Sequence, residues 1–152
     1  MFYRSLTKSI KNKLQTAQNK MIRYILGYGS RHHLTVNDFK KVKMLDVQSR
    51  VNYLTLNMMH NVFYGLAPEY LCTFTKISEI HDHETRNSML GYHIPHTNSH
   101  GKSSFMYNGA KLWNDLPISI KTVESKELFK FSSKKHQFKI MSLLESSEYI
   151  YF

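Results

Sequence analysis

The chain has 152 residues, of which 41% are hydrophobic and 13% aromatic, so a disordered chain is excluded and one domain with a modest core is expected. The net charge of +10 favours polyanionic partners such as nucleic acid. One cysteine excludes an internal disulfide, and neither a signal peptide nor an apolar run that spans a bilayer is visible. We therefore expect an intracellular protein, in the nucleus or the cytoplasm.

An amphipathic helix is predicted over residues 5–26, because its apolar residues recur at spacings of three and four. These residues are Leu6, Ile10, Leu14, Ala17, Met21 and Ile25. Gly27 and Gly29 are typical stop signals after it. We expect the rest of the chain to supply a core that buries this stripe, with the cations of the helix on its other faces.

Two further helices are predicted over residues 36–43 and from about Val47 to Tyr64. One face of the second helix comprises Val47, Val51, Leu54, Met58 and Val62, and another apolar strip comprises Leu56, Met59 and Phe63. A helix that is apolar on two sides is usually the central one of a bundle. Gly65 is expected to end it, and Pro68 to open a short helix that reaches about residue 74.

The sequence is less regular after this point. Residues 76–88 are polar and are predicted to form a loop. Residues 89–95 and 102–107 are predicted to form short strands around a turn-rich segment at 97–101. A helix is expected over residues 107–115, with Leu112 and Trp113 as its anchors in the core.

A last helix is predicted from a cap at Ser125 to about Leu144. The predicted fold is therefore mainly α, a small helical bundle with a short two-stranded β-hairpin insert. We expect one helical domain over residues 1–145, followed by a tail over residues 146–152.

The sequence favours neither catalysis nor a metal site. Its acidic residues are not clustered as a two-metal polymerase site requires. The candidate zinc ligands are Cys72, His81, His83, His93, His96 and His100. Their spacing lacks the paired cysteines of structural zinc sites, and Cys72 is expected to be a small buried hydrophobe. We expect no enzyme activity of the chain on its own, no metal and no cofactor.

Five segments resemble, in order, the stretch that follows the reverse-transcriptase domain in the polyproteins of jockey-like LINE (non-LTR) retrotransposons. They are Leu14–Arg23 (LQTAQNKMIR), Gly65–Leu71 (GLAPEYL), Thr85–Ser88 (TRNS), Ser103–Phe105 with Ala110–Pro117 (SSF and AKLWNDLP), and the last helix. Together they cover about residues 12–144. The sequence departs from the family's pattern at Asn87, where a small hydroxyl residue is usual, and at Gly109-Ala110, where the family has alanine and proline.

The resemblance implies a fragment of an RNA-directed DNA polymerase polyprotein from a transposable element. Nothing in the sequence resembles the catalytic Tyr-x-Asp-Asp region or the endonuclease. The chain is similar to a truncated copy of such an element or to the product of a fragmented reading frame. Its expected partners are RNA or DNA backbone and the reverse-transcriptase core of the same element, and no membrane is expected.

Positive charge gathers near the amino end, because residues 1–50 contain 11 basic and 2 acidic side chains. Such a patch binds phosphates in a salt-sensitive manner that is independent of base sequence. The residues expected to contact nucleic acid are Lys8, Lys11, Lys20, Arg23 and Arg31, and on the last helix Lys130 and Lys134. We also expect Lys40, Lys41 and Lys43 to join them if the second helix packs nearby.

The leading interpretation is a non-catalytic module that helps to hold template RNA or target DNA. A second interpretation is a structural module that braces the polymerase thumb without touching nucleic acid, with Leu56, Met59 and Phe63 facing a missing neighbour. A third is a membrane-surface helix at residues 5–26, which has a basic and an apolar face but no tryptophan. Exposed aromatic residues near Lys102 and Lys111 would be able to stack on unpaired bases, but core packing of Tyr92, Phe105 and Tyr107 is favoured.

Overall fold

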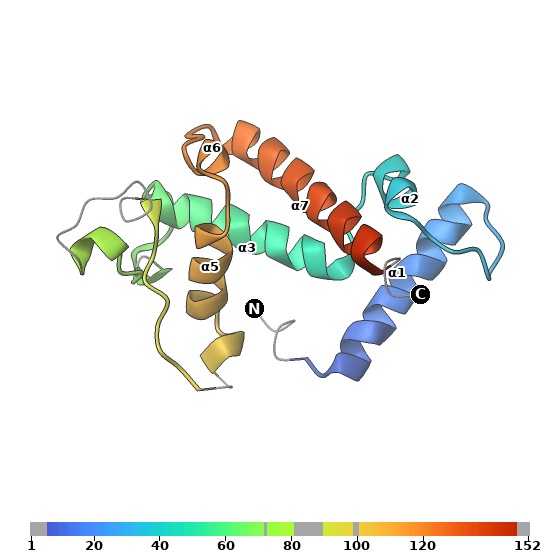
Figure 1. The fold of residues 1–152 in the computed structure, drawn as a ribbon, viewed down its shortest axis with the longest axis horizontal. Coiled ribbons are helices and arrows are strands. Elements are labelled where there is room, and N and C mark those ends of the chain that lie inside the picture. The colour runs from blue at the N-terminus through green and yellow to red at the C-terminus, as the bar shows by residue number, and fades with distance from the viewer. Residues whose placement is uncertain (1–5, 72, 81–89, 99–100, 149–152) are drawn as a thin grey trace. The chain divides into compact units, whose positions relative to one another are not determined.

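A computed structural model describes residues 6–71, 73–80, 90–98 and 101–148, and these are mainly helical, as predicted (Figure 1). The α-helices are α1 (Lys8–Leu26), α2 (Val36–Lys41), α3 (Val47–Phe63), α5 (Phe105–Asn114), α6 (Ile118–Lys121) and α7 (Lys126–Glu148). Short 3-10 helices are η2 (Glu69–Leu71), η3 (Ile77–Glu79) and η4 (Gly101–Ser103).

The contacts within the chain divide it into two compact units, where the sequence predicted one domain over 1–145. The central unit comprises Leu54–Ser133, and the terminal unit comprises Phe2–Tyr53 together with Lys134–Phe152. The long helices α3 and α7 contribute residues to both. The last helix, predicted to reach about Leu144, continues to Glu148.

The core of the central unit forms where α5 and the first turns of α7 pack on α3. Its buried residues are Leu56, Met59, Val62, Tyr92, Ala110, Trp113, Leu116 and Phe129. Trp113 is fully buried, and its ring lies 5.1 Å from that of Phe63 and 6.0 Å from that of Phe129. The structural interpretation placed Leu56, Met59 and Phe63 against a missing part of the polymerase. In the structure Leu56 and Met59 belong to this core, and Phe63 packs against it.

The predicted β-hairpin is not present in the described part of the chain, and the cause is local. Ser104 caps α5 by accepting a hydrogen bond from Tyr107 N over 3.2 Å, so residues 105–107 form the first turn of a helix instead of a strand. Tyr92 instead forms an isolated antiparallel bridge with Lys76.

The segment around Tyr92 is held on its other side by the end of α5. Tyr92 N donates to the Asn114 side-chain oxygen over 2.9 Å, and the Asn114 side-chain nitrogen donates back to Tyr92 O over 2.8 Å. Trp113 Nε1 donates to Leu90 O over 2.8 Å. The Trp-Asn pair of the AKLWNDLP segment thus has a structural role: it fastens residues 90–92 to the core.

Two of the buried polar side chains in the central unit, His60 and Lys121, are titratable. His60 lies between the rings of Tyr64 and Phe129, and its Nε2 is 2.9 Å from Val123 O. Burial lowers the pKa of the His60 imidazole. Lys121 is also buried and its ammonium donates to Asn114 O, where it neutralises the carboxyl end of α5; burial lowers the pKa of this ammonium as well.

The terminal unit has its own core, formed by Ile22, Val36, Phe39, Leu45 and Met141. It takes these residues from α1, α2, α7 and the segment that joins α2 to α3. The predicted end of α1 is confirmed, because Gly27 adopts a φ of 68° and its N–H bonds back to the carbonyls of the last turn. An αL cap of this kind favours glycine and stops the helix.

The face that α1 buries differs from the predicted one. Ile22 is the buried side chain of α1, whereas Ile10, Leu14, Met21 and Ile25 are between 43% and 55% exposed. The reason is that two glutamine side chains of α1 form hydrogen bonds with the backbone near Leu45, which apolar spacing does not indicate. Gln18 donates to Leu45 O over 2.8 Å, and Gln15 accepts from Val47 N over 3.0 Å. These bonds turn the glutamine face inward and leave the apolar stripe outside.

Candidate nucleic-acid interface

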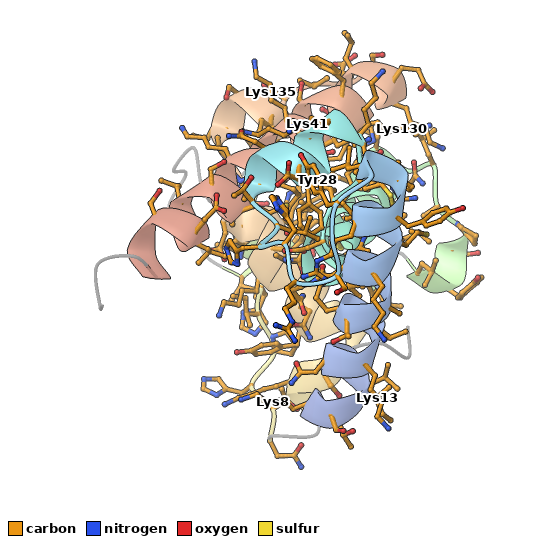
Figure 2. The ribbon with its side chains drawn as sticks, turned by 90° about the vertical axis from the view of Figure 1, so that its right-hand side faces the viewer. Lys8, Lys13, Tyr28, Lys41, Lys130 and Lys135 are labelled. Carbon is orange, nitrogen blue, oxygen red and sulfur yellow. The ribbon has the colours of Figure 1, made fainter. Side chains whose placement is uncertain are left out.

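The cations of α1 do not lie together on one face. At 100° per residue, Lys8 and Lys11 fall near the inward side of the helix, whereas Lys13 and Lys20 fall on the outward side. Figure 2 shows Lys8 and Lys13 extending from different sides of the first turns. The predicted single patch is therefore two groups of side chains with different surroundings.

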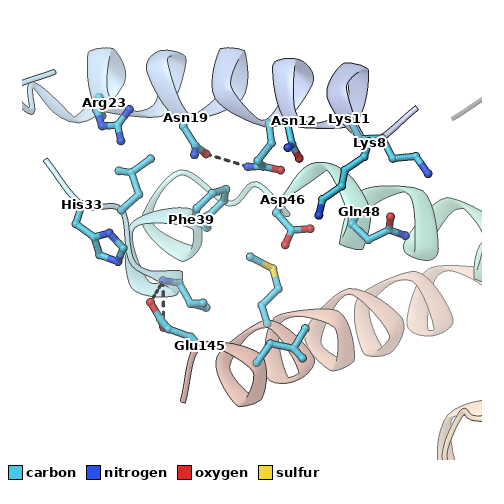
Figure 3. A pocket seen from close by; sticks show the side chains of 15 residues that line it. Lys8, Lys11, Asn12, Asn19, Arg23, His33, Phe39, Asp46, Gln48 and Glu145 are labelled. Atoms are coloured by element: carbon cyan, nitrogen blue, oxygen red, sulfur yellow. Dashed lines mark hydrogen bonds between the residues drawn. The ribbon is translucent and has the colours of Figure 1, made fainter. Parts of the chain in front are cut away.

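The inward group borders a pocket of about 700 Å³ in the terminal unit (Figure 3). The polar wall contributed by α1 consists of Lys8, Lys11, Asn12, Gln15, Asn19 and Arg23, and the other walls consist of His33, Leu34, Val36, Phe39, Asp46, Gln48, Met141, Leu144 and Glu145. Lys8 lies at the end that also holds Asp46 and Gln48, and Arg23 and His33 lie at the other end.

The carboxylates of this pocket already serve the fold. Glu145 accepts from Val36 N over 3.2 Å at the start of α2, and Asp46 accepts from Ser49 N at the start of α3. Both are helix caps. They also place two negative charges in the same pocket as Lys8 and Lys11. The attraction of this pocket for an anion is therefore weaker than its lysines alone would give.

The outward group borders a second hollow, of about 670 Å³. Its lining residues are Lys8, Ser9, Asn12, Lys13, Thr16, Ala17 and Lys20, and none is acidic. Lys13 and Lys20 are exposed, and neither forms an ion pair with another described residue. We call the line of Lys13, Ala17 and Lys20 the outward strip of α1. Of the basic residues near the amino end, its two lysines are the best suited to a polyanion.

The two predicted arginines differ in availability. Arg23 is partly buried, and its Nε donates to His32 O over 2.7 Å, so it fastens the connection after α1 to the helix. The rings of His32 and Tyr28 also pack together, with their centroids 4.0 Å apart. Arg31 is exposed in the same connection. Of the two, Arg31 is the one with its side chain directed to solvent.

Of the three lysines near α2, Lys40 and Lys41 use their side chains in contacts within the protein, whereas Lys43 contributes its backbone carbonyl and has an exposed side chain. Lys41 Nζ lies 3.0 Å from Asp38 Oδ1 and donates to Tyr28 OH over 3.0 Å. Lys40 donates to Ser142 Oγ over 3.4 Å. Lys43 has a φ of 55°, and its carbonyl accepts from Lys134 Nζ. These contacts fix the packing of α2 and leave Lys41 matched by the protein's own carboxylate.

Asp38 is the centre of that arrangement. The buried carboxylate accepts from the backbone N–H and the hydroxyl of Thr35, from Tyr28 OH and from Lys41, each over 3.0 Å. The hydrogen bond from the Thr35 backbone, followed by that from Lys41, holds the pKa of Asp38 far below its usual value. The bonds to Tyr28 and Asp38 raise the pKa of Lys41.

The predicted contacts on α7 are both engaged. Lys130 Nζ is 3.4 Å from Glu127 Oε1 on the same helix, in a pair that is exposed and therefore weak. Lys134 donates to Lys43 O over 3.0 Å. The repulsion expected between lysines four apart is thus reduced by groups of the protein itself.

Among the described residues, no group of three or more His, Cys, Asp or Glu side chains is placed to hold a metal ion. The candidate ligands Cys72, His81, His83 and His100, like the TRNS segment, lie outside the described residues. No helix in the described ranges is long and apolar enough to cross a membrane.

Compared with protein-family models, curated proteins and solved structures, the chain matches none of them.

The sequence interpretation missed one exposed aromatic residue. Tyr24 is 88% exposed on the outward side of α1, four residues after Lys20. None of the three aromatic residues considered for base stacking is fully exposed. Tyr92 is buried, Phe105 packs against the core, and Tyr107 is half-buried. The spacing of Tyr24 from Lys13 and Lys20 was readable from the sequence, but its exposure depends on which face α1 buries.

Proposed function

We propose that the outward strip of α1 binds the phosphate backbone of nucleic acid, as a non-catalytic segment of a LINE-type RNA-directed DNA polymerase that helps to hold template RNA or target DNA. The observation that supports this most is the state of Lys13 and Lys20. Both are exposed, border a hollow in which none of the described lining residues is acidic, and lack an ion pair with any described residue. Lys8 also lines this hollow, and Arg31 is a further exposed cation of the same unit.

The phosphate contact is tested by removing both charges of the strip. The double variant Lys13→Ala, Lys20→Ala is expected to bind RNA or DNA oligonucleotides more weakly than the parent chain. Its plot of log K against log salt is expected to be flatter by about 1.4–1.8, because each lost phosphate contact removes about 0.7–0.9 from the slope. The measurement is fluorescence anisotropy across a salt series.

A matched control is available in the central unit. Lys102 and Lys111 are also exposed lysines, so Lys102→Ala, Lys111→Ala removes the same net charge without touching α1. This control is expected to keep the slope of the parent chain. An equal loss in both double variants would show that net charge alone attracts the ligand, and no binding at low salt would refute the proposal.

The second candidate function is an interaction module that braces a neighbouring part of the polymerase. The exposed apolar stripe of α1, formed by Ile10, Leu14, Met21 and Ile25, supports it, and it replaces the strip of α3 that the sequence indicated. A continuous apolar surface of this kind usually meets a partner.

This candidate is tested with a dye that binds apolar surface. The chain is expected to enhance the dye's fluorescence or to dimerise, and Leu14→Gln with Met21→Gln is expected to reverse either effect while the helical circular dichroism remains. Nucleic-acid binding that survives these two changes would separate the stripe from the phosphate contact. A parent chain that neither binds dye nor associates would argue against a bracing role.

A further inference from the structure

One strip of α1 combines two cations with a free aromatic ring. Residues 13, 17, 20 and 24 follow one another at intervals of four, three and four, so their side chains lie along one line of the helix. Lys13 and Lys20 stand at the first and third positions, and Tyr24 closes the line about 16 Å from Lys13 at 1.5 Å per residue. Ala17 lies between the lysines, where a small side chain leaves room.

The Tyr24 ring is not used by the fold. It is 88% exposed, and no ring contact or side-chain hydrogen bond joins it to another described residue. Tyr28, one turn further on, is used by the fold: its ring packs on His32, and its hydroxyl donates to Asp38. An exposed tyrosine that makes no contact contributes little to stability. Its place one turn after Lys20 and in line with Lys13 offers an extended ligand one aromatic ring and two cations.

We infer that Tyr24 stacks on an unpaired base while Lys13 and Lys20 contact the neighbouring phosphates, so that the strip prefers single-stranded nucleic acid to a duplex. Proteins that hold single strands without reading their sequence combine a positive track with aromatic rings, because every base has a π-face. In a duplex the bases are already stacked on one another, and the tyrosine would gain no partner. This inference rests on the proposed function and adds the class of strand and the residue that selects it.

Stacking and phosphate contact respond differently to salt, and this difference provides the test. Tyr24→Ala is expected to weaken binding of a labelled oligouridine of about 12 nucleotides by roughly 5- to 100-fold, the usual effect of losing one stacked base. The slope of log K against log salt should not change, because no phosphate contact is lost. Affinity for a duplex hairpin should change less than about twofold, since stacking does not contribute there.

Three companion variants control for other effects. Tyr24→Phe keeps the ring and should retain binding, whereas Tyr24→Leu keeps an apolar side chain without a π-face and should lose it. Tyr70 is 76% exposed in the central unit, and no lysine or arginine lies within five residues of it in the sequence. Tyr70→Ala should therefore leave binding unchanged. Alanine is a better helix former than tyrosine, so Tyr24→Ala should not unfold α1.

The outcomes separate this inference from the proposed function. Oligouridine binding that is salt-sensitive but unaffected by Tyr24→Ala would overturn the inference and leave the phosphate contact standing. Failure of the parent chain to bind any oligonucleotide at low salt would overturn both. A Tyr24→Ala change that weakens binding to phosphatidylserine vesicles and leaves oligouridine binding intact would also overturn the inference, in favour of a membrane surface.

Discussion

Trp113→Ala is expected to lower the free energy of unfolding by about 3–5 kcal/mol, the usual range for removing a large buried aromatic side chain. The ring is fully buried among Phe63, Tyr92 and Phe129 in the core of the central unit. The variant would leave a cavity there. It would also leave the half-buried Leu90 without the indole donor to its carbonyl, and the lost hydrogen bond adds to the loss of stability.

The measurement is urea unfolding followed by far-ultraviolet circular dichroism, because the chain has one tryptophan and the variant removes it. Amide hydrogen exchange should show the loss of protection in α3 and α5, the helices that pack on the ring. Leu128→Ala is the control, because Leu128 is 61% exposed in the same unit and should change stability by less than about 0.5 kcal/mol. A Trp113→Ala loss as small as the control's would contradict the proposed core.

Asp38→Ala is expected to destabilise the terminal unit by about 2–4 kcal/mol. The substitution removes the acceptor that Asp38 offers to the N–H and hydroxyl of the N-cap residue Thr35, and it leaves Tyr28 OH and the Lys41 ammonium without their acceptor. Asp38→Asn keeps the shape but loses the charge, so it should have a smaller effect. Hydrogen exchange is expected to show faster exchange in α2 and in residues 28–35, while α5 is unchanged.

The Asp38 effect should depend on pH in a defined direction. Because its pKa is lower in the folded chain than the ordinary value of 3.8, the carboxylate stabilises the fold at pH values above about 4, and this contribution is lost as the pH falls towards the folded pKa. The stability difference between the parent chain and Asp38→Ala should therefore be largest near neutral pH and shrink at about pH 3. Glu69→Ala, at an exposed carboxylate, is the control. A difference that is equal at both pH values would refute the role of the ionised carboxylate.

The long helices α1, α3 and α7 were predictable from local signals, and the face that α1 buries was not. Apolar spacing and Gly27 are sufficient to delimit α1 to within a few residues. The face that α1 buries depends on Gln15, which accepts from Val47 N, and on Gln18, which donates to Leu45 O. These partners are 32 and 27 residues away in the sequence, so local patterns do not indicate them. A search for apolar periodicity treats both glutamines as solvent-exposed residues.

The same limit applies to the cations of the candidate interface. The Lys41–Asp38 pair is three residues apart on a helix and was readable from the sequence. The bond from Lys134 to Lys43 O joins residues 91 positions apart, so nothing local indicates it. Counting charges therefore predicted a basic first third of the chain, but only the folded structure separates Lys13 and Lys20 from lysines that already have partners.

Asn114 illustrates how narrowly one position of the fold is specified. Lys76 pairs with one edge of the segment around Tyr92, and the Asn114 amide bonds the other edge, where it provides one acceptor and one donor as a peptide group would. Aspartate would set a second lone pair against the Tyr92 carbonyl, glutamine would overshoot by a methylene, and alanine would offer nothing. None of these three residues can replace Asn114 in both bonds, so any of them at this position is expected to release Tyr92 from the end of α5.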